Sequence, residues 1–167
     1  MGKSRQKIGL NWNELTEISK KEVKKKIKDR DTRIWREKME EKETLKWYRK
    51  GKEKIQYDQC YRNGLSSKLL ARARTNTLKL EEVINRRNRE YDKTCKLCGA
   101  EEENLRHYIL ECPRLEGKRD RGLMEKWRNI DKDKQLIDIL FNEKDHEKLR
   151  QMLGTMWQHR KDLLRPP

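Results

Sequence analysis

The sequence has 167 residues, which is enough for one domain, and its composition already narrows the class of protein. Charged side chains make up 44% of the chain and hydrophobic ones 32%, and valine occurs only twice. These proportions disfavour a large β-sandwich or a doubly wound sheet, while three prolines and eight glycines exclude a collagen-like chain. A net charge of +15 indicates a surface that attracts polyanions, most often nucleic acid.

The basic charge is concentrated in the N-terminal third, where residues 1–56 hold 19 basic and 10 acidic side chains. Residues 1–50 are predicted to form a basic helical leader, with helical patterns over residues 13–29, capped by Asn13, and over residues 32–51. The pattern leaves open whether these are two helices or one long bent helix. A lysine cluster in the first of them is a candidate for phosphate contact: Lys24, Lys25 and Lys26.

Glycine and asparagine interrupt the pattern over residues 51–64, which we interpret as a linker. A helical module over residues 65–128 is expected next, with a short helix capped by Ser66 or Ser67 and another near residues 78–85. Residues 114–128 also have a helical pattern, and residues 129–167 are predicted to form the C-terminal helices. Strand signals are nearly absent, apart from a possible small hairpin at residues 94–99. The predicted fold is therefore mainly α.

A set of metal-ligand residue types lies within residues 94–113 of that module. Cys95, Cys98, His107 and Cys112 follow the spacing C-x2-C-x8-H-x4-C. Three thiolates and one imidazole complete a tetrahedral zinc shell, and a shell with no open position is typical of a structural site. We therefore expect one structural zinc that staples a small helical assembly, and we expect Gly99 to supply the positive φ of the cysteine turn.

The second ligand pair places a constraint on the local helix. Glu101, Glu102 and Glu103 favour a helix start, and His107 would then project from that helix. Cys112 lies five residues further on, about 140° away from the histidine around an ideal α-helix. The helix must therefore loosen or end near Cys112, where Pro113 supplies a stop.

The sequence around this motif resembles the zinc-binding segment that follows the polymerase in non-LTR (LINE-type) retrotransposon proteins. The resemblance rests on Arg74-Thr75-Asn76-Thr77-Leu78, Cys95-x2-Cys98-Gly99, Glu101–Glu103, His107-x4-Cys112-Pro113 and Arg119, and it covers roughly residues 65–120. It implies a fragment that holds template RNA or target DNA beside a reverse transcriptase, in cis or in trans.

The enzymatic parts of such a polyprotein are not evident in the sequence. Tyr57-Asp58-Gln59-Cys60 holds one acid where a polymerase needs paired aspartates, and neither a Ser/His/Asp set nor a P-loop occurs. We therefore expect no enzymatic activity and assign no catalytic residue.

The predicted function is binding of RNA or single-stranded DNA by a zinc-dependent module. Besides the lysine cluster, there are two groups of candidate contact residues. Four arginines flank the metal motif: Arg72, Arg74, Arg86 and Arg87. Three further residues are the groups nearest the metal: Lys96, Arg106 and Tyr108. Tyr108 is read equally well as a core residue. The alternative is a zinc-stapled structural or protein-interaction module without direct nucleic-acid contact, because residues 95–112 hold four acidic and only two basic side chains.

The sequence also gives an expectation about location. No apolar run approaches the roughly 18 residues that a membrane span requires. The N-terminus has no apolar segment of the kind that secretory signals contain. We therefore expect no membrane association and an intracellular protein, in a nuclear or cytoplasmic ribonucleoprotein.

Overall fold

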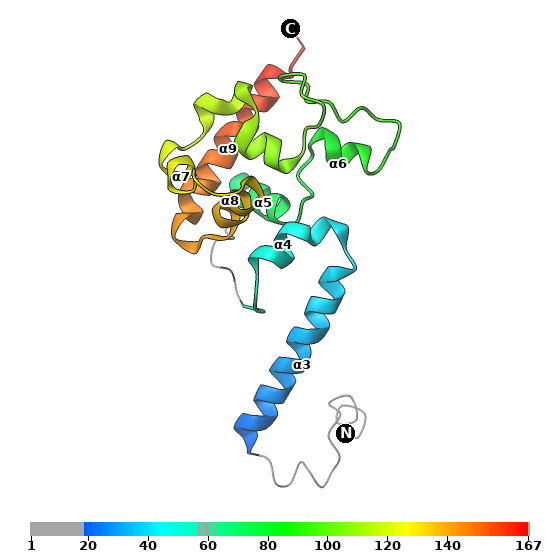
Figure 1. Cartoon of the computed structure of the whole chain (residues 1–167), viewed down its shortest axis with the longest axis vertical. Coiled ribbons are helices and arrows are strands. Elements are labelled where there is room, and N and C mark those ends of the chain that lie inside the picture. Colours follow the sequence, from blue (N-terminus) through cyan, green and yellow to red (C-terminus); the bar gives the residue numbers. More distant parts are fainter. Residues whose placement is uncertain (1–18, 57, 59–60, 62, 167) are drawn as a thin grey trace. The chain divides into compact units, whose positions relative to one another are not determined.

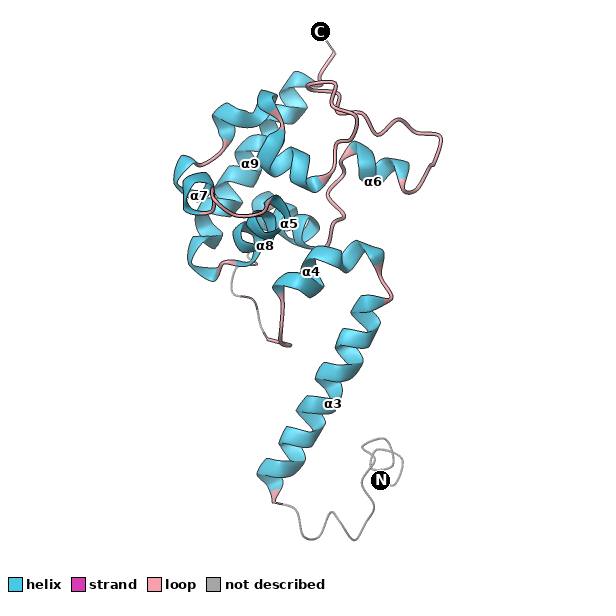
Figure 2. Cartoon of the chain, viewed as in Figure 1, coloured by secondary structure: helices cyan, strands magenta, loops and turns pink. Residues whose placement is uncertain are grey.

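The structure, a computed structural model, describes residues 19–56, 58, 61 and 63–166, and their regular elements are all helical (Figures 1 and 2). This confirms the mainly α fold class. The chain divides into two compact units, residues 1–43 and residues 44–167. The sequence placed the end of the leader at residue 50, whereas residues 44–50 belong structurally to the second unit.

The described part of the first unit is the long helix α3, Lys20–Glu40. It starts with a capping box, in which the Glu22 backbone N–H donates to Ser19 Oγ over 3.3 Å and the Ser19 N–H donates to Glu22 Oε2 over 2.9 Å. The helix continues without a break through residues 29–32, between the two helical patterns of the sequence. The proposed Asn13 cap lies outside the described residues.

The second unit begins with η1, Glu43–Leu45, at its boundary, followed by α4, Lys46–Gly51. This helix packs against α8, Lys132–Phe141. Trp47 is 5% exposed and belongs to the hydrophobic core, which is why residues 46–50 are not part of a solvated leader. Gly51 lies so close to Phe141 that a Cβ on it would be 2.1 Å from the Cδ2 atom of the ring.

The centre of the second unit is the contact between α5, Leu65–Arg74, and α9, His146–Leu163. Both helices contribute fully buried aliphatic side chains at helical spacing, including Leu69 and Leu70 from α5 and Leu149 and Leu153 from α9. Burial of apolar surface contributes about 25 cal/mol per Å² to the free energy of folding. The packing of α5 against α9 is therefore a main source of stability.

The serine cap expected at the start of α5 is wrong. The helix begins after Gly64, and Ser66 and Ser67 both lie inside its first turn, without a side-chain cap. Ser67 Oγ instead accepts a hydrogen bond from Arg150 Nη1 of α9, over 3.1 Å. The serines therefore serve the contact between two helices that are far apart in sequence.

The remaining elements are short: α6, Glu81–Asn85; the π-helical turn η2, His107–Glu111; the 3₁₀ helix η3, Pro113–Lys118; α7, Arg121–Lys126; and η4, Glu143–Asp145. The single helix expected over residues 114–128 is divided, because Asp120 caps α7 by accepting from the Leu123 N–H over 2.8 Å. Residues 94–99 form a turn and not a strand hairpin.

Candidate metal centre

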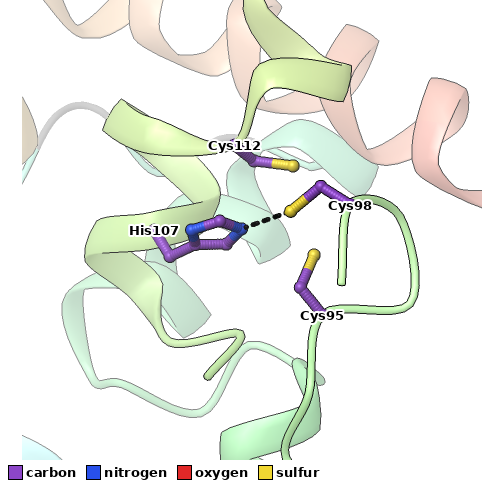
Figure 3. Close-up of side chains that lie close together, drawn as sticks. All are labelled: Cys95, Cys98, His107 and Cys112. Carbon is purple, nitrogen blue, oxygen red and sulfur yellow. Dashed lines mark hydrogen bonds between the residues drawn. The ribbon is translucent and has the colours of Figure 1, made fainter. Parts of the chain in front are cut away.

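Four side chains converge on one point in the second unit (Figure 3). Cys95 and Cys98 come from the loop after α6, and His107 and Cys112 come from the start of η2 and the residue after its end. Their ligand atoms all lie within 4.8 Å of one another, and His107 Nε2 is 3.3 Å from Cys98 Sγ. The sequence prediction that these four residues meet is confirmed, and they are close enough to hold a metal ion.

The first two ligands are held by a tight backbone turn. The Gly99 N–H donates to the Cys95 carbonyl, and the Cys95 N–H donates to the Ala100 carbonyl, both over 2.8 Å. Gly99 has a φ of 78°, as the sequence predicts for this position. These bonds point both sulfur atoms to the same side of the loop (Figure 3).

The last two ligands are brought together by a π-helical turn. The Cys112 N–H donates to the His107 carbonyl over 2.7 Å, which is the i→i+5 hydrogen bond that defines this geometry. Five residues then complete about one turn, so the histidine and the cysteine reach the same side of the helix. The prediction that the helix loosens before Cys112 is confirmed, and Pro113 starts η3.

The helix does not start at the three glutamates, because residues 101–104 are not helical. Asn104 makes the start instead, since its Oδ1 accepts from the His107 N–H over 2.9 Å. The sequence signal for this start is the cap residue three positions before the histidine, and the acidic run lies outside the helix. Glu103 has a different role, behind the cysteine turn.

Two arginines that were not predicted as part of the site support its backbone. Arg119, which the resemblance included without a role, donates from Nε to the Ile109 carbonyl over 2.8 Å and from Nη2 to the Cys112 carbonyl over 2.7 Å. These bonds fix the open end of the π turn. Arg160 of α9 holds Glu103, whose Oε1 is 3.9 Å from Cys95 Sγ.

Burial controls the protonation of the ligands. It raises the pKa of the Cys95 thiol to about 12 and also raises the pKa of the Cys112 thiol, while it lowers the pKa of His107. Without a metal the thiols of Cys95 and Cys112 are therefore protonated and the His107 imidazole is neutral. A cation that binds here replaces the thiol protons and supplies the positive charge that favours thiolates.

Some of the predicted contact residues are exposed. Lys24, Lys25 and Lys26 are exposed on α3, and Arg72, Arg87 and Lys96 are exposed in the second unit. Lys96 also forms an ion pair with Glu81 and a hydrogen bond to the Tyr91 hydroxyl.

Two further candidates are only half-buried and already hold partners. Arg86 pairs with Glu82 at 3.2 Å and donates to the Asn76 carbonyl over 2.7 Å. Arg106 forms ion pairs with Glu111 at 3.3 Å and with Asp133 at 3.4 Å. Contact with a nucleic acid would therefore compete with these intramolecular bonds.

Arg74 and Tyr108 are wrongly predicted as contact residues, because each is 1% exposed. The Arg74 guanidinium donates to the Leu140 carbonyl over 2.8 Å and to the Tyr61 hydroxyl over 3.2 Å. The Tyr108 ring packs edge-on against Trp157, with 6.4 Å between ring centroids. Neither side chain can reach a ligand outside the protein, so the metal motif has no exposed aromatic at this position.

Comparisons with protein-family models, curated proteins and solved structures found no match to this chain. Among the described helices, none combines the length and the apolar character needed to cross a membrane.

Proposed function

We propose that this chain is a zinc-stapled module that binds RNA or single-stranded DNA. The observation that carries the proposal is the convergence of Cys95, Cys98, His107 and Cys112 in a chain with a net charge of +15. Three sulfur atoms and one imidazole nitrogen are the donors that zinc prefers, and four protein ligands leave no position open for a reacting water. The zinc would therefore hold the fold, and we assign no catalytic residue.

In this proposal the metal shapes the surface and the basic side chains make the contacts. Arg72 lies on α5, Arg87 follows α6 and Lys96 lies within the cysteine turn, and all three are exposed. Lysine and arginine that neutralise phosphates release counterions, so affinity should fall steeply with salt. The burial of Tyr108 makes base stacking at the metal motif a minor contribution.

The resemblance to non-LTR retrotransposon proteins extends the proposal to a biological setting. A fragment of that kind would hold template RNA or target DNA beside a reverse transcriptase, in cis or in trans, within an intracellular ribonucleoprotein. The polymerase itself would be a separate part of such an assembly.

One observation favours a second candidate function. The ligands Cys95, His107 and Cys112 are buried, and residues 95–112 hold more acidic than basic side chains. A zinc site of this kind would organise helices for a protein partner without touching nucleic acid. The two candidates differ in whether the basic side chains around the site determine binding.

Fluorescence anisotropy with a labelled RNA and a labelled single-stranded DNA tests the proposal on the zinc-loaded chain. The variant Arg72→Gln/Arg87→Gln should weaken binding about tenfold or more, whereas Lys118→Gln/Lys161→Gln removes the same charge from η3 and α9 and should change it little. Cys98→Ser should lose zinc and weaken binding. No salt-sensitive binding by the wild type would sink the proposal in favour of the protein-interaction module.

A further inference from the structure

The long helix α3 carries a lysine surface of defined geometry. Lys20, Lys21, Lys24, Lys25 and Lys28 fall within an arc of about 140° around the helix axis, at about 100° per residue. We call these five residues the lysine arc. It extends over about 12 Å of helix length, at about 1.5 Å per residue. Lys26, which the sequence grouped with Lys24 and Lys25, points to the other side of the helix.

The lysine arc is free to meet an external partner. All five side chains are exposed, and none forms an ion pair or hydrogen bond within the described part of the chain. The arginines further along differ, since Arg30 pairs with Asp31 at 2.7 Å and Arg33 lies 4.0 Å from Glu37. The first half of α3 therefore presents positive charge that the described protein does not neutralise.

We propose that the lysine arc binds the backbone of duplex DNA by laying α3 into the major groove. This inference rests on the proposed nucleic-acid-binding function and adds a second, duplex-binding surface to it. The major groove of B-form DNA is about 12 Å wide and admits one α-helix, with phosphates along both walls. An arc of about 140° lets lysines on its two edges, Lys20 and Lys25, reach opposite walls.

The width of the arc distinguishes a duplex from a single strand. A single strand presents its phosphates along one line. A narrow row of side chains, such as Lys20, Lys24 and Lys28, would be sufficient to contact them. Lys21 and Lys25 would then contribute little. In the groove all five lysines have phosphates within reach, so more counterions are released and the salt dependence is steeper.

The composition of the arc also predicts a lack of sequence preference. Adenine in the major groove is read by asparagine and glutamine through paired hydrogen bonds, and guanine by arginine or lysine, of which only arginine has a rigid fork of donors. The arc contains only lysines, which act as point charges on flexible stems. Binding should therefore be similar for duplexes of different sequence.

The test is fluorescence anisotropy on the full zinc-loaded chain, with a labelled 20-base-pair duplex and with the same labelled strand alone. The arc variant is Lys24→Gln/Lys28→Gln. The matched control, Lys26→Gln/Arg33→Gln, removes two positive charges from the other side of the same helix. Glutamine is a good helix former, and circular dichroism would verify that α3 is retained.

We expect the arc variant to lose about tenfold or more in duplex affinity, with a salt slope shallower by about 2, and the control to lose less than about threefold. The single strand should be affected less than the duplex.

Equal losses for the two variants, or equal losses for duplex and single strand, would overturn the duplex surface while leaving the proposed function intact. Tighter binding to vesicles of anionic lipid than to the duplex would also overturn it. A chain that binds no nucleic acid would refute both proposals.

Discussion

Arg160 and Glu103, 57 residues apart, form a pair of parallel hydrogen bonds, from Nε to Oε1 over 2.8 Å and from Nη2 to Oε2 over 2.7 Å. Both side chains are buried, and Arg160 Nη2 also donates to Glu81 over 2.8 Å. The last helix, α9, is thereby joined to the loop that carries the cysteine turn and to α6. The end of the chain thus helps to position the first two metal ligands.

Replacing Arg160 with leucine should destabilise the protein by about 3–5 kcal/mol, because it leaves Glu103 buried without its charged partner and Glu81 with Lys96 alone. Urea unfolding of the metal-loaded chain measures this. Arg165→Leu is the matched control, since Arg165 is 72% exposed and lies 4.0 Å from Asp162, and it should change stability by less than about 1 kcal/mol. Similar midpoints for the two variants would show that the buried network does not hold the loop.

Metal removal should unfold the region around the four ligands. Binding at structural zinc sites stabilises by roughly 10 kcal/mol, which is large beside the net stability of a small domain. We expect a strong chelator to reduce the helical circular dichroism signal and to lower the thermal midpoint.

The variant Cys98→Ser provides the control for chelation. It should resemble the chelated wild type before any chelator is added, and chelator should then have little further effect. A wild-type spectrum that a strong chelator leaves unchanged would contradict the role of the metal as a staple.

The contact between α4 and α8 should be sensitive to a single methyl group. A Cβ at Gly51 would lie 2.1 Å from Phe141 Cδ2, so Gly51→Ala must displace the ring and should cost about 1–3 kcal/mol. Gly117→Ala, whose Cβ would meet nothing within 4 Å, should be close to neutral. Thermal unfolding distinguishes the two, and equal midpoints would mean that the ring moves aside freely.

His146 should make stability depend on pH. Burial lowers its pKa, and the neighbouring Arg74 guanidinium, 2.6 Å from Nε2, lowers it further. In the unfolded chain the imidazole takes up a proton below a pH of about 6.5. The unfolded state therefore binds more protons there, so the contribution is complete above that pH and is lost as the pH falls below it.

The measurement is the difference in unfolding free energy between the wild type and His146→Gln, taken from about pH 5 to about pH 8. The difference should shift in favour of the wild type as the pH rises and become constant above a pH of about 7. Glu143 and Asp58, which favour the charged form, moderate this effect, and Arg150 adds to it. A difference that does not vary with pH would show that His146 titrates alike in both states.

The local features of the site could be predicted from the sequence. Cys95, Cys98 and Gly99 lie within five residues, so one turn determines their geometry, and the positive φ of Gly99 follows from it. The separation of five residues between His107 and Cys112 was sufficient to predict that the helix loosens before Cys112. Both inferences use neighbours in the chain, where the geometry of a residue is limited by the backbone.

The roles of Arg74 and Glu103 could not be predicted in this way. Each is charged, which favours a surface or helix-start position, but each is buried against a partner more than 50 residues away, at Leu140 and at Arg160. From a sequence pattern one can infer that burying a charge is costly. The pattern does not identify the distant group that compensates for this cost. The hydrogen bond from Arg150 to Ser67, which are 83 residues apart, could not be predicted for the same reason.

The π turn between His107 and Cys112 also has a consequence for insertions and deletions. An ordinary α-helical turn would bring a histidine and a cysteine together at a separation of four, so the chain carries one residue more than that turn requires. Deleting Leu110, which lies between them, would close the π turn into an ordinary α-helical turn, with both ligands still on one side of the helix. Arg119 donates to the carbonyls on either side of that deletion, at Ile109 and Cys112, so the length of this segment determines whether one guanidinium can reach both.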